Sequence, residues 1–206
     1  VATNAGGPHC LKYGFTTNHV LGLELVTGTG DVVRAGGKAA DRPGYDLTGV
    51  AVGNEGTFGL VTAVTVRLLH LPEAVKTALA SFATVVEASE AVSAIIAAGI
   101  IPAALEMLDE AMIGAVNAAV GKVYPDGAGA VLLIELDGPR AEVEAQAERV
   151  AAICRERQAL LVTVARDEAE RALLWKGRKE AAGAVGRITA AYLLQDAVVP
   201  RSKLPQ

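Results

Sequence analysis

Apolar and polar residues follow a strand-like pattern in the first third of the chain. Three runs rich in Val, Leu and Thr alternate or stay apolar over a few residues: HVLGLELVT at 19–27, DVVRAGG at 31–37 and LVTAVTVRLL at 60–69. Runs of this kind, separated by glycine turns, are typical of β-strands. The turn between the first two runs is Thr-Gly-Thr-Gly-Asp, so the pattern predicts a hairpin over residues 23–36.

A long polar stretch, KAADRPGYDLTGVAVGNEG, separates the second and third strand-like runs at residues 38–56. It is too polar and too often interrupted by Gly and Pro to form a long helix or strand. Loops of this length in a compact domain usually carry function or are ordered by a ligand.

The pattern changes near Leu71-Pro72-Glu73. Four short apolar runs follow, and an alanine-rich segment of helical period comes after each of them. The predicted strands lie at 76–83, 103–109, 130–136 and 159–165, and the predicted helices at 84–99, 110–121, 138–157 and 167–185. This alternation predicts a layered domain of sheet and helices. We therefore divide the chain near residues 72–76, into domains of residues 1–75 and 76–206.

Residues that begin and end helices flank these segments. Thr84 is suited to be the N-cap of the first helix, Pro139 suits the first position of the third, and Asp167 with Glu170 resembles a capping box. Gly99 and Gly121 follow helices, where a left-handed residue is favoured.

Composition and charge narrow the function classes. The chain has 206 residues, is 51% hydrophobic and carries a formal charge of -4, without a basic stripe, which argues against nucleic acid as a partner. No apolar run reaches the roughly 18 to 20 residues that a transmembrane helix needs, and no secretory signal opens the sequence. Cys10 and Cys154 lack the spacing of a zinc site or a disulfide framework, so we expect no metal and a reducing, cytoplasmic setting.

Two glycine-rich loops are candidate ligand sites. They are NAGGPHCLKYG at 4–14 and GNEGTFG at 53–59. Glycine serves either a tight turn, through its dihedral freedom, or a backbone cradle for a phosphate, because no Cβ blocks the approach. Neither loop matches the dinucleotide-binding GxGxxG or the P-loop. Spacing alone favours ordinary turns, although the two loops could lie side by side and offer amide groups to a diphosphate.

Three segments in the same order carry a family resemblance: NAGGPHCLKYG, GYDLTGVAVGNEGTFGLVTAVTVRLL and LLWKGRKEAAGAVGRI. They resemble the FAD-linked oxidases of the vanillyl-alcohol-oxidase type, in particular the group of glycolate oxidase, D-lactate and D-2-hydroxyglutarate dehydrogenases. The resemblance implies an α+β flavoprotein that oxidises glycolate to glyoxylate. Residues 1–75 would be the C-terminal part of a strand-rich FAD-binding domain. Residues 76–206 would be the N-terminal part of the substrate or cap domain, a ferredoxin-like antiparallel sheet with helices on one face.

The resemblance also assigns cofactor-binding positions. The first loop would lie against the flavin ring and its ribityl chain through Asn4, Ala5, Gly6 and Gly7. The second loop and the start of the following strand would line the diphosphate and adenosine end through Gly53, Glu55, Gly56, Thr57, Gly59, Leu60 and Val61. Asn54 stands where relatives more often carry serine, and Phe58 replaces leucine at a position expected to be packed.

The segment WKGR contains the candidate for substrate binding. Arg178 matches the arginine that binds the substrate carboxylate in related 2-hydroxy-acid dehydrogenases, a task that suits the planar guanidinium fork. The alternative is a solvated charge on a helix surface. Tyr192 either faces the substrate or is a core or interface tyrosine. Leu194 or its neighbour stands where the 2-hydroxyglutarate enzymes carry lysine, which favours an acid with one carboxylate.

Other polar residues receive no catalytic role. His9 and Cys10 raise the idea of a covalent flavin link or a reactive thiol, but an ordinary loop histidine and a packed thiol are the favoured interpretation, with FAD held non-covalently. Glu106, Asp109 and Glu110 are better explained by Asp109 capping the next helix than by a catalytic carboxylate pair. His19 and His70 are isolated in the sequence.

The resemblance also names segments that this sequence lacks: an earlier glycine-rich loop and a later histidine cluster. We therefore expect an internal part of a longer subunit that binds FAD weakly or not at all by itself and has no turnover. In the intact protein we expect other oxidase subunits and a quinone-linked electron acceptor. For the 206-residue chain itself, exposed strand edges of the flavin domain favour pairing between chains, such as a homodimer. The expected location is cytoplasmic, with the inner face of the membrane, reached through partner subunits, as the alternative. D-lactate oxidation and a non-catalytic partner-binding module are the alternative functions.

Overall fold

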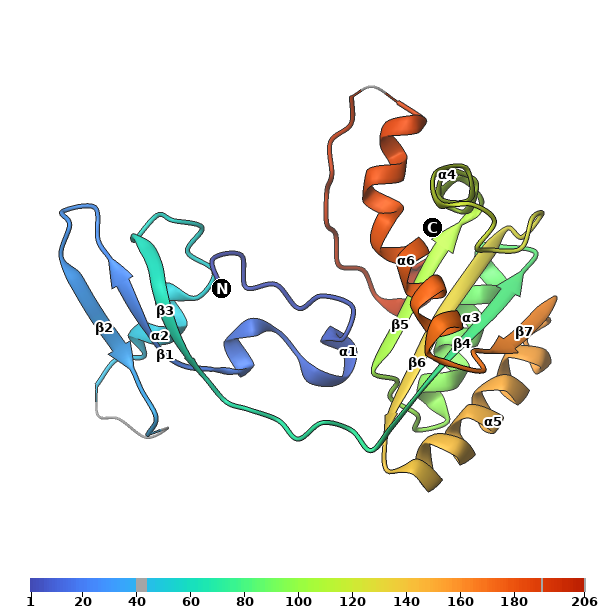
Figure 1. Ribbon diagram of the computed structural model, residues 1–206, viewed down its shortest axis with the longest axis horizontal. Coiled ribbons are helices and arrows are strands. Elements are labelled where there is room, and N and C mark those ends of the chain that lie inside the picture. The colour runs from blue at the N-terminus through green and yellow to red at the C-terminus, as the bar shows by residue number, and fades with distance from the viewer. Residues whose placement is uncertain (40–43, 190, 206) are drawn as a thin grey trace. The chain divides into compact units, whose positions relative to one another are not determined.

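The computed structural model describes residues 1–39, 44–189 and 191–205. The chain forms two compact units, Val1–Leu71 and Pro72–Gln206, and Figure 1 labels their helices and strands. The first strand of the second unit already begins at Ala74, a few residues before the boundary that the sequence predicts after residue 75.

The first unit is built on a three-stranded antiparallel sheet in the order β2-β1-β3. Its elements are α1 (Cys10–Tyr13), η1 (Thr16–Asn18), β1 (Val20–Val26), β2 (Val32–Gly36), α2 (Leu47–Ala51) and β3 (Leu60–Val66). The predicted hairpin is confirmed: Val26 pairs with Val32, and the Thr27 amide donates to the Asp31 carbonyl at 2.9 Å. All three strand-like runs of the sequence are strands in the structure.

The core of this unit is small. Val20, Leu23 and Leu25 of β1 pack against Ala51 and Val52, at the end of α2. Residues 44–56 of the long polar stretch contain only the short helix α2, whose N-cap Asp46 accepts from the Gly49 amide at 2.8 Å; residues 40–43 lie outside the described part of the chain. Several apolar side chains remain exposed, Leu60 of β3 at 70% and the following Leu68 and Leu71 at 85% and 92%.

The second unit contains a four-stranded antiparallel sheet in the order β5-β6-β4-β7. Its elements are β4 (Ala74–Phe82), α3 (Val85–Ala97), β5 (Ala104–Asp109), α4 (Glu110–Val120), β6 (Ala130–Gly138), α5 (Arg140–Glu156), β7 (Leu161–Val164), α6 (Glu168–Ala184), η2 (Val185–Arg187) and η3 (Arg201–Lys203). With α4 as an insertion between β5 and β6, the β4-α3-β5-β6-α5-β7 order is that of the predicted ferredoxin-like sheet. The alternation of strands and helices is therefore confirmed.

Helices cover both faces of this sheet instead of the single face that we expected. On one face, α3 and α5 pack on Phe82 and Leu132, and on the other, α4 and α6 pack on Leu79 and Val131; Figure 1 shows this layering. The physical reason is in β6, whose residues from Ala130 to Leu136 are all buried. A strand that is apolar on both faces needs cover on both.

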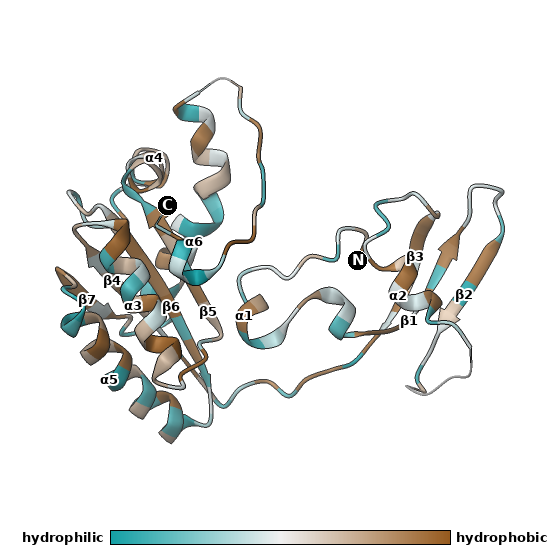
Figure 2. Cartoon of the chain, turned by 180° about the vertical axis from the view of Figure 1, so that it is seen from behind, coloured by the Kyte–Doolittle hydropathy of each residue, from teal (hydrophilic) through white to brown (hydrophobic). Residues whose placement is uncertain are grey.

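Hydropathy follows the same arrangement in Figure 2, where β6 is largely hydrophobic and α5 shows polar and apolar bands along its length. In α5 the buried positions Val143, Ala147, Val150, Ala151 and Cys154 recur at helical spacing. The polar bands between them belong to the exposed side of an amphipathic helix.

The helix caps largely follow the sequence. Thr84 accepts from the Glu87 amide at 3.2 Å and the Glu87 carboxylate accepts from the Thr84 amide, a complete capping box. Asp167 accepts from the Glu170 amide at 2.9 Å, but the Glu170 carboxylate binds the Arg166 amide instead of closing the box. The third helix starts one position later than expected, so Pro139 is its N-cap.

Both glycines expected after helices have positive φ, 76° at Gly99 and 97° at Gly121. No helix in residues 1–39, 44–189 and 191–205 combines the length and the apolar character needed to cross a membrane.

Candidate functional site

The two glycine-rich loops lie side by side in the first unit. The Gly53 amide donates to the Val1 carbonyl at 3.1 Å, and the Glu55 amide donates to the Ala2 carbonyl at 2.9 Å. A Cβ added to Gly53 would lie 3.3 Å from the Asn4 Cβ. The adjacency that the sequence allowed is therefore confirmed as geometry.

The first loop is fixed by hydrogen bonds to residues 16 and 17, while three of its backbone amides remain free in the part of the chain that the structure describes. The Asn4 side chain accepts from the Thr17 amide at 2.9 Å, and the Ala5 carbonyl accepts from the Thr16 amide and hydroxyl at 3.1 and 2.6 Å. Within the described residues, the amides of Ala5, Gly6 and Gly7 donate to no protein acceptor. Consecutive free amides of this kind are suited to bind carbonyl or anionic oxygens of a ligand.

Close packing restricts the residue type at the centre of this loop. A Cβ at Gly6 would lie 2.5 Å from the Cys10 Sγ and 3.2 Å from the Phe15 ring. Cys10 thus acts as a small packing residue below the loop, and His9 makes an edge contact with Tyr13 at 6.4 Å between ring centroids.

The second loop is a self-bonded turn. Asn54 is buried, its side chain donates to the Ala51 carbonyl and accepts from the Gly56 amide, both at 2.6 Å, and its carbonyl accepts from the Thr57 amide at 2.9 Å. Together with the two bonds to the first loop, these contacts engage the amides of Gly53, Glu55, Gly56 and Thr57. These four amides therefore already have acceptors within the protein. Contact of Gly53, Glu55, Gly56 and Thr57 with the cofactor through other atoms stays a prediction.

The remaining positions of the second loop have structural reasons. A Cβ at Gly59 would lie 2.3 Å from the Val26 carbonyl oxygen, so the approach of β3 to β1 requires glycine. Phe58 is 56% exposed, which corrects the expectation that it is packed. Leu60 is also exposed, whereas Val61 packs against the core of the unit. Contact of Gly59, Leu60 and Val61 with a cofactor stays a prediction.

In the second unit, three polar residues form one stripe along α6. Arg171, Trp175 and Arg178 are spaced i, i+4 and i+7, which places them on the same side of a helix. This side faces the sheet, where Glu135 of β6 and Glu106 of β5 lie on the face that α6 covers. The helix therefore binds to two carboxylates of the sheet.

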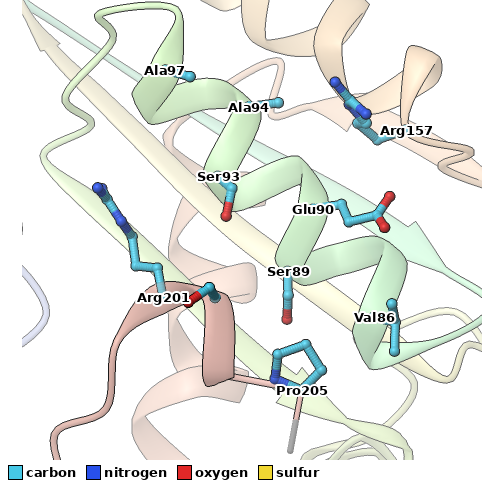
Figure 3. A pocket seen from close by; sticks show the side chains of 10 residues that line it. Val86, Ser89, Glu90, Ser93, Ala94, Ala97, Arg157, Arg201 and Pro205 are labelled. Carbon is cyan, nitrogen blue, oxygen red and sulfur yellow. The ribbon is translucent and has the colours of Figure 1, made fainter.

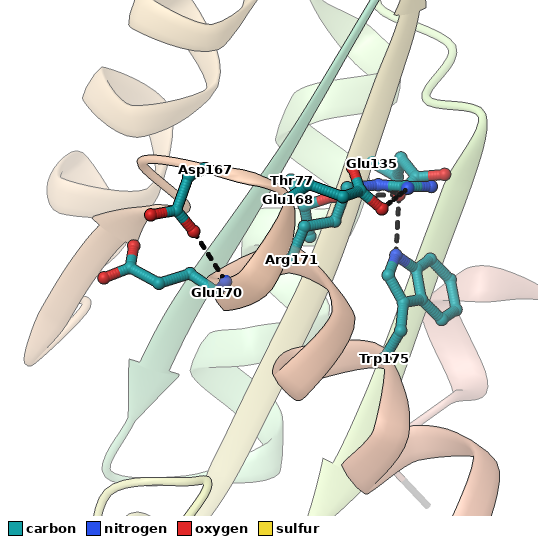
Figure 4. Close-up of polar contacts among 7 residues, drawn as sticks. All are labelled: Thr77, Glu135, Asp167, Glu168, Glu170, Arg171 and Trp175. Carbon is teal, nitrogen blue, oxygen red and sulfur yellow. Dashed lines mark hydrogen bonds and ion pairs between the residues drawn. The ribbon is translucent and has the colours of Figure 1, made fainter.

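Glu135 is the most buried of these carboxylates, at 2% exposure. One of its oxygens accepts from the Thr77 hydroxyl at 2.8 Å, the Arg171 Nε at 2.9 Å and the Trp175 Nε1 at 2.6 Å, as drawn in Figure 4. The hydrogen bond to Glu135 raises the pKa of Arg171, although partial burial opposes this. The carboxylate thus anchors α6 to the sheet through charge and hydrogen bonds.

Sequence reasoning missed Glu135. The available signal was a single acidic residue in the apolar run AVLLIEL, at a position of the same parity as the buried Val131 and Leu133. A buried acid in a strand requires a partner, and the R-x-x-x-W-x-x-R spacing of α6 supplies donors.

Gly177 lets another ring approach α6. A Cβ at this position would lie 2.8 Å from the Tyr124 hydroxyl oxygen, and that hydroxyl donates to the Leu174 carbonyl at 3.0 Å. Burial raises the pKa of Tyr124 to about 12. In the WKGR segment, Trp175 therefore fixes α6 to the sheet, Gly177 makes room for Tyr124, and Arg178 supplies a guanidinium.

Arg178 is paired, not free on the helix surface. Its Nε donates to the Glu106 carboxylate at 2.6 Å, with side-chain exposures of 39% and 18%. In the described part of the chain, its two terminal amino groups donate to no protein acceptor. Glu106 is thus the partner of an arginine, and Asp109 caps α4 by accepting from the Met112 amide at 2.9 Å, as expected.

Tyr192 is held near the end of α6. Its hydroxyl donates to the Ala182 carbonyl at 3.2 Å and half of the residue is exposed. Leu194 is 76% exposed. Within residues 1–39, 44–189 and 191–205, neither side chain forms a hydrogen bond with Arg178, so a shared substrate site stays a prediction.

Comparison with known families agrees with this geometry. The model of FAD linked oxidases, C-terminal domain, matches residues 71–206, and the model of an FAD binding domain matches residues 1–36. The chain belongs to the FAD-linked oxidase family. The predicted resemblance is confirmed. The match over residues 71–206 includes the whole second unit.

Curated relatives of this FAD-linked oxidase chain include the glycolate oxidase subunit GlcD of Escherichia coli, 46% identical over 205 residues, and that of Bacillus subtilis, 45% identical over 202 residues. A probable mitochondrial D-lactate dehydrogenase of Danio rerio is 35% identical over 212 residues. The matches include 100%, 98% and 100% of this chain, but only 41%, 43% and 42% of the relatives. The chain thus spans about two fifths of their length.

Solved structures support the fold of the FAD-linked oxidase chain. An alkyldihydroxyacetonephosphate synthase aligns with a TM-score of 0.67 at 20% identity, covering 91% of this chain and 36% of that one. A p-cresol methylhydroxylase aligns with a TM-score of 0.57 at 15% identity, covering 76% and 37%. At these identities the likeness shows the fold alone.

A groove of about 570 Å³ beside α3 is separate from the residues discussed above (Figure 3). Its lining includes Ser89, Ser93, Arg157 and Arg201. None of the residues predicted for FAD or substrate lines it.

Among the described residues, no group of three or more His, Cys, Asp or Glu side chains is arranged so that it could hold a metal ion. The His19 ring is in hydrogen-bond contact with the Tyr13 carbonyl at 2.8 Å. Cys154 is buried, which raises its pKa to about 11.

Proposed function

We propose that an intact subunit containing this chain oxidises a small 2-hydroxy acid with FAD, and that its substrate is glycolate. The observation that carries the proposal is Arg178, a half-exposed guanidinium fixed through Nε with both terminal amino groups available. Such a fork binds a carboxylate through two parallel hydrogen bonds. The 46% identity to a glycolate oxidase subunit supports glycolate over D-lactate, for which the relative is 35% identical.

The residues of the first loop fit FAD. The amides of Ala5, Gly6 and Gly7 are consecutive donors without protein acceptors, on a loop fixed by Asn4 and Thr16. They would hold carbonyl or phosphate oxygens of the cofactor. The adjacent turn at Gly53–Gly59 fixes the chain just before this loop, because its amides donate to the carbonyls of residues 1 and 2. When bound, FAD supplies the acceptor for the two electrons removed from the substrate.

Arg178 performs the step that this chain contributes to the reaction. Binding the carboxylate fixes C2 of the acid relative to the protein, so that the reacting hydrogen is presented in one orientation. Trp175 and Arg171 fix α6 to the sheet through their hydrogen bonds to Glu135. The position of the Arg178 guanidinium on this helix is therefore fixed as well. We assign no described residue to accept the hydroxyl proton.

Partners and location extend the same proposal. The relatives named glycolate oxidase subunits support assembly with other subunits. A quinone-linked electron acceptor is part of the proposal. Exposed Leu60, Leu68 and Leu71 support burial of this surface by other protein, with a homodimer as one form. We propose a cytoplasmic location, with attachment to the inner membrane face through partner subunits as the alternative.

The test is replacement of Arg178 in the intact, flavin-loaded subunit. We expect Arg178→Met to raise the KM for glycolate by roughly ten- to a hundredfold, the value of losing hydrogen bonds to a charged group. Arg178→Lys should recover only part of this, because lysine keeps the charge and loses the fork. Lys179→Met, an exposed neighbour, is the matched control. An unchanged KM in Arg178→Met at full flavin content would contradict the proposal.

A further inference from the structure

The ion pair between Glu106 and Arg178 is arranged so that the arginine keeps its binding edge. The bond runs from Nε to one Glu106 oxygen at 2.6 Å, and Glu106 is the more buried partner, at 18% side-chain exposure against 39%. The Nε contact leaves the outer edge of the guanidinium, between its two amino groups, without a protein acceptor in the described part of the chain. That edge can bind a carboxylate through two parallel hydrogen bonds.

Both partners sit on fixed backbone. Glu106 lies within β5, where it is paired in register with Leu133 of the buried strand β6. Arg178 lies one helical turn after Trp175, whose indole donates to the buried Glu135 at 2.6 Å. The contact between Trp175 and Glu135 therefore joins α6 to β6, and the contact between Arg178 and Glu106 joins α6 to β5.

A free arginine side chain has considerable rotamer freedom, and a ligand must restrict it on binding. A contact at Nε removes rotation of the guanidinium plane before the ligand arrives. Glu106 also compensates the positive charge of Arg178, whose side chain is 39% exposed. The partly buried guanidinium therefore needs no second carboxylate partner from the protein.

We propose that Glu106 is a positioning residue for substrate binding: it holds Arg178 so that the terminal amino groups face the carboxylate of the 2-hydroxy acid. This inference rests on the proposed function of Arg178. Glu106 acts through Arg178 and does not touch the substrate. From the sequence alone, Glu106 receives no role.

The experiment measures the KM and kcat for glycolate in the intact, flavin-loaded subunit for Glu106→Ala, Glu106→Gln and Arg178→Met, and for Glu106→Ala combined with Arg178→Met. We expect Glu106→Ala to raise the KM by on the order of tenfold, as for one charge-assisted hydrogen bond, with a smaller change in kcat. Glu106→Gln should restore most of the affinity, because its amide oxygen still accepts from Nε. In the Arg178→Met background, Glu106→Ala should add nothing.

Controls separate positioning from folding. Glu110→Ala, in the first turn of α4, is the matched acidic control and should leave the KM unchanged. Flavin content and the thermal unfolding midpoint are recorded for every variant, and the coupling is read only from variants that retain flavin. If Glu106→Ala reduces flavin content, Glu106→Met takes its place, since methionine keeps the side-chain volume but offers Nε no oxygen acceptor.

Three results would overturn the inference: an unchanged KM in Glu106→Ala, a Glu106→Gln variant as weak as Glu106→Ala, or the same increase in KM with and without Arg178. Failure of the proposed function is distinguishable, because in that case Arg178→Met itself leaves the KM unchanged. A raised KM in Arg178→Met together with an unaffected Glu106→Ala would remove only the positioning role.

Discussion

Glu135 shows how a single residue holds the candidate site together. One oxygen of its buried carboxylate accepts hydrogen bonds from Thr77 of β4 and from Arg171 and Trp175 of α6. A buried carboxylate is tolerated because it is paired and hydrogen-bonded. Removal of a donor leaves it partly unsatisfied.

We expect Trp175→Phe to destabilise the second unit by about 1–3 kcal/mol, because phenylalanine fills only part of the space of the indole and cannot donate to Glu135. Urea unfolding of the protein measures this. Arg166→Ala, which breaks the exposed pair between Arg166 and Glu170, is the control and should change the free energy of unfolding little. Equal effects of the two substitutions would show that the Glu135 contacts contribute no more than a surface pair.

Gly6 makes the first loop sensitive to one added methyl group. We expect Gly6→Ala to lower the FAD affinity of the intact subunit, because the Cβ would lie 2.5 Å from the Cys10 Sγ and push the free amides out of place. Cys10→Gly in the same chain should recover part of the affinity by making room. Gly7→Ala is less informative, since its φ of 64° strains any side chain. Wild-type affinity in Gly6→Ala, measured by flavin titration, would show that the loop geometry is unimportant.

Individual residues were predicted where a local rule applies and missed where pairing crosses the fold. Thr84 and Asp109 were predicted as caps because an N-cap needs only its own helix. The partner of Arg178 was not predicted, since Glu106 lies on β5 and is brought near only by the sheet register. The sequence also did not reveal that Asn54, Val1 and Ala2 accept hydrogen bonds from the amides of the second loop, because no spacing predicts such contacts.

The second unit has two buried acids of high pKa that make its helices sensitive to alkaline pH. Cys154 on α5 has a pKa raised from 9.0 to about 11, and Tyr124, packed against α6, has one raised from 10.0 to about 12, both by burial. When the folded pKa is the higher one, the unfolded chain releases its proton first as pH rises. Stability is therefore fully present below pH 9.0 and is lost as pH rises toward about 11 and 12.

We expect the unfolding free energy of the second unit to fall steadily above pH 9.0 and Cys154→Ala to reduce the slope between pH 9.0 and about 11. Denaturant unfolding at a series of pH values measures it. Cys10→Ala, which alters a half-exposed thiol of the other unit, is the matched control and should leave the slope of the second unit unchanged. A slope that is identical with and without Cys154 would contradict the assignment.

Elements were predicted well wherever a period was long and uninterrupted. All four strands and four helices of the second unit follow the apolar runs and the alanine-rich segments behind them. The error was the placement of all helices on one face. Residues such as Val131 and Leu132 are both apolar in sequence and face opposite sides of the sheet, so the run itself required cover on both faces.

The molecule as a whole is an FAD-linked oxidase chain that spans about two fifths of its curated relatives. Its first unit has a small core and exposed apolar side chains, while its second unit has a continuous core on both faces of the sheet. Among the cofactor contacts expected, this chain offers three free amides on the first loop and none from Gly53, Glu55, Gly56 or Thr57.

We therefore expect the 206-residue chain by itself to bind FAD weakly or not at all and to show no turnover, whereas an intact subunit binds it tightly. A few backbone donors without surrounding walls leave the cofactor in water. Titration of each protein with FAD, followed by flavin fluorescence, measures the difference. Stoichiometric, tight binding by the 206-residue chain would contradict this expectation.

If this polypeptide belongs to a flavoenzyme that oxidises glycolate, as we propose, glycolate reduces the bound flavin. The most direct measurement mixes the intact, FAD-loaded subunit with glycolate in the absence of oxygen and follows the loss of visible flavin absorbance. We expect rapid bleaching by glycolate, slower bleaching by D-lactate and none by D-2-hydroxyglutarate. A flavin that stays oxidised with all three acids would contradict it and favour the non-catalytic, partner-binding alternative.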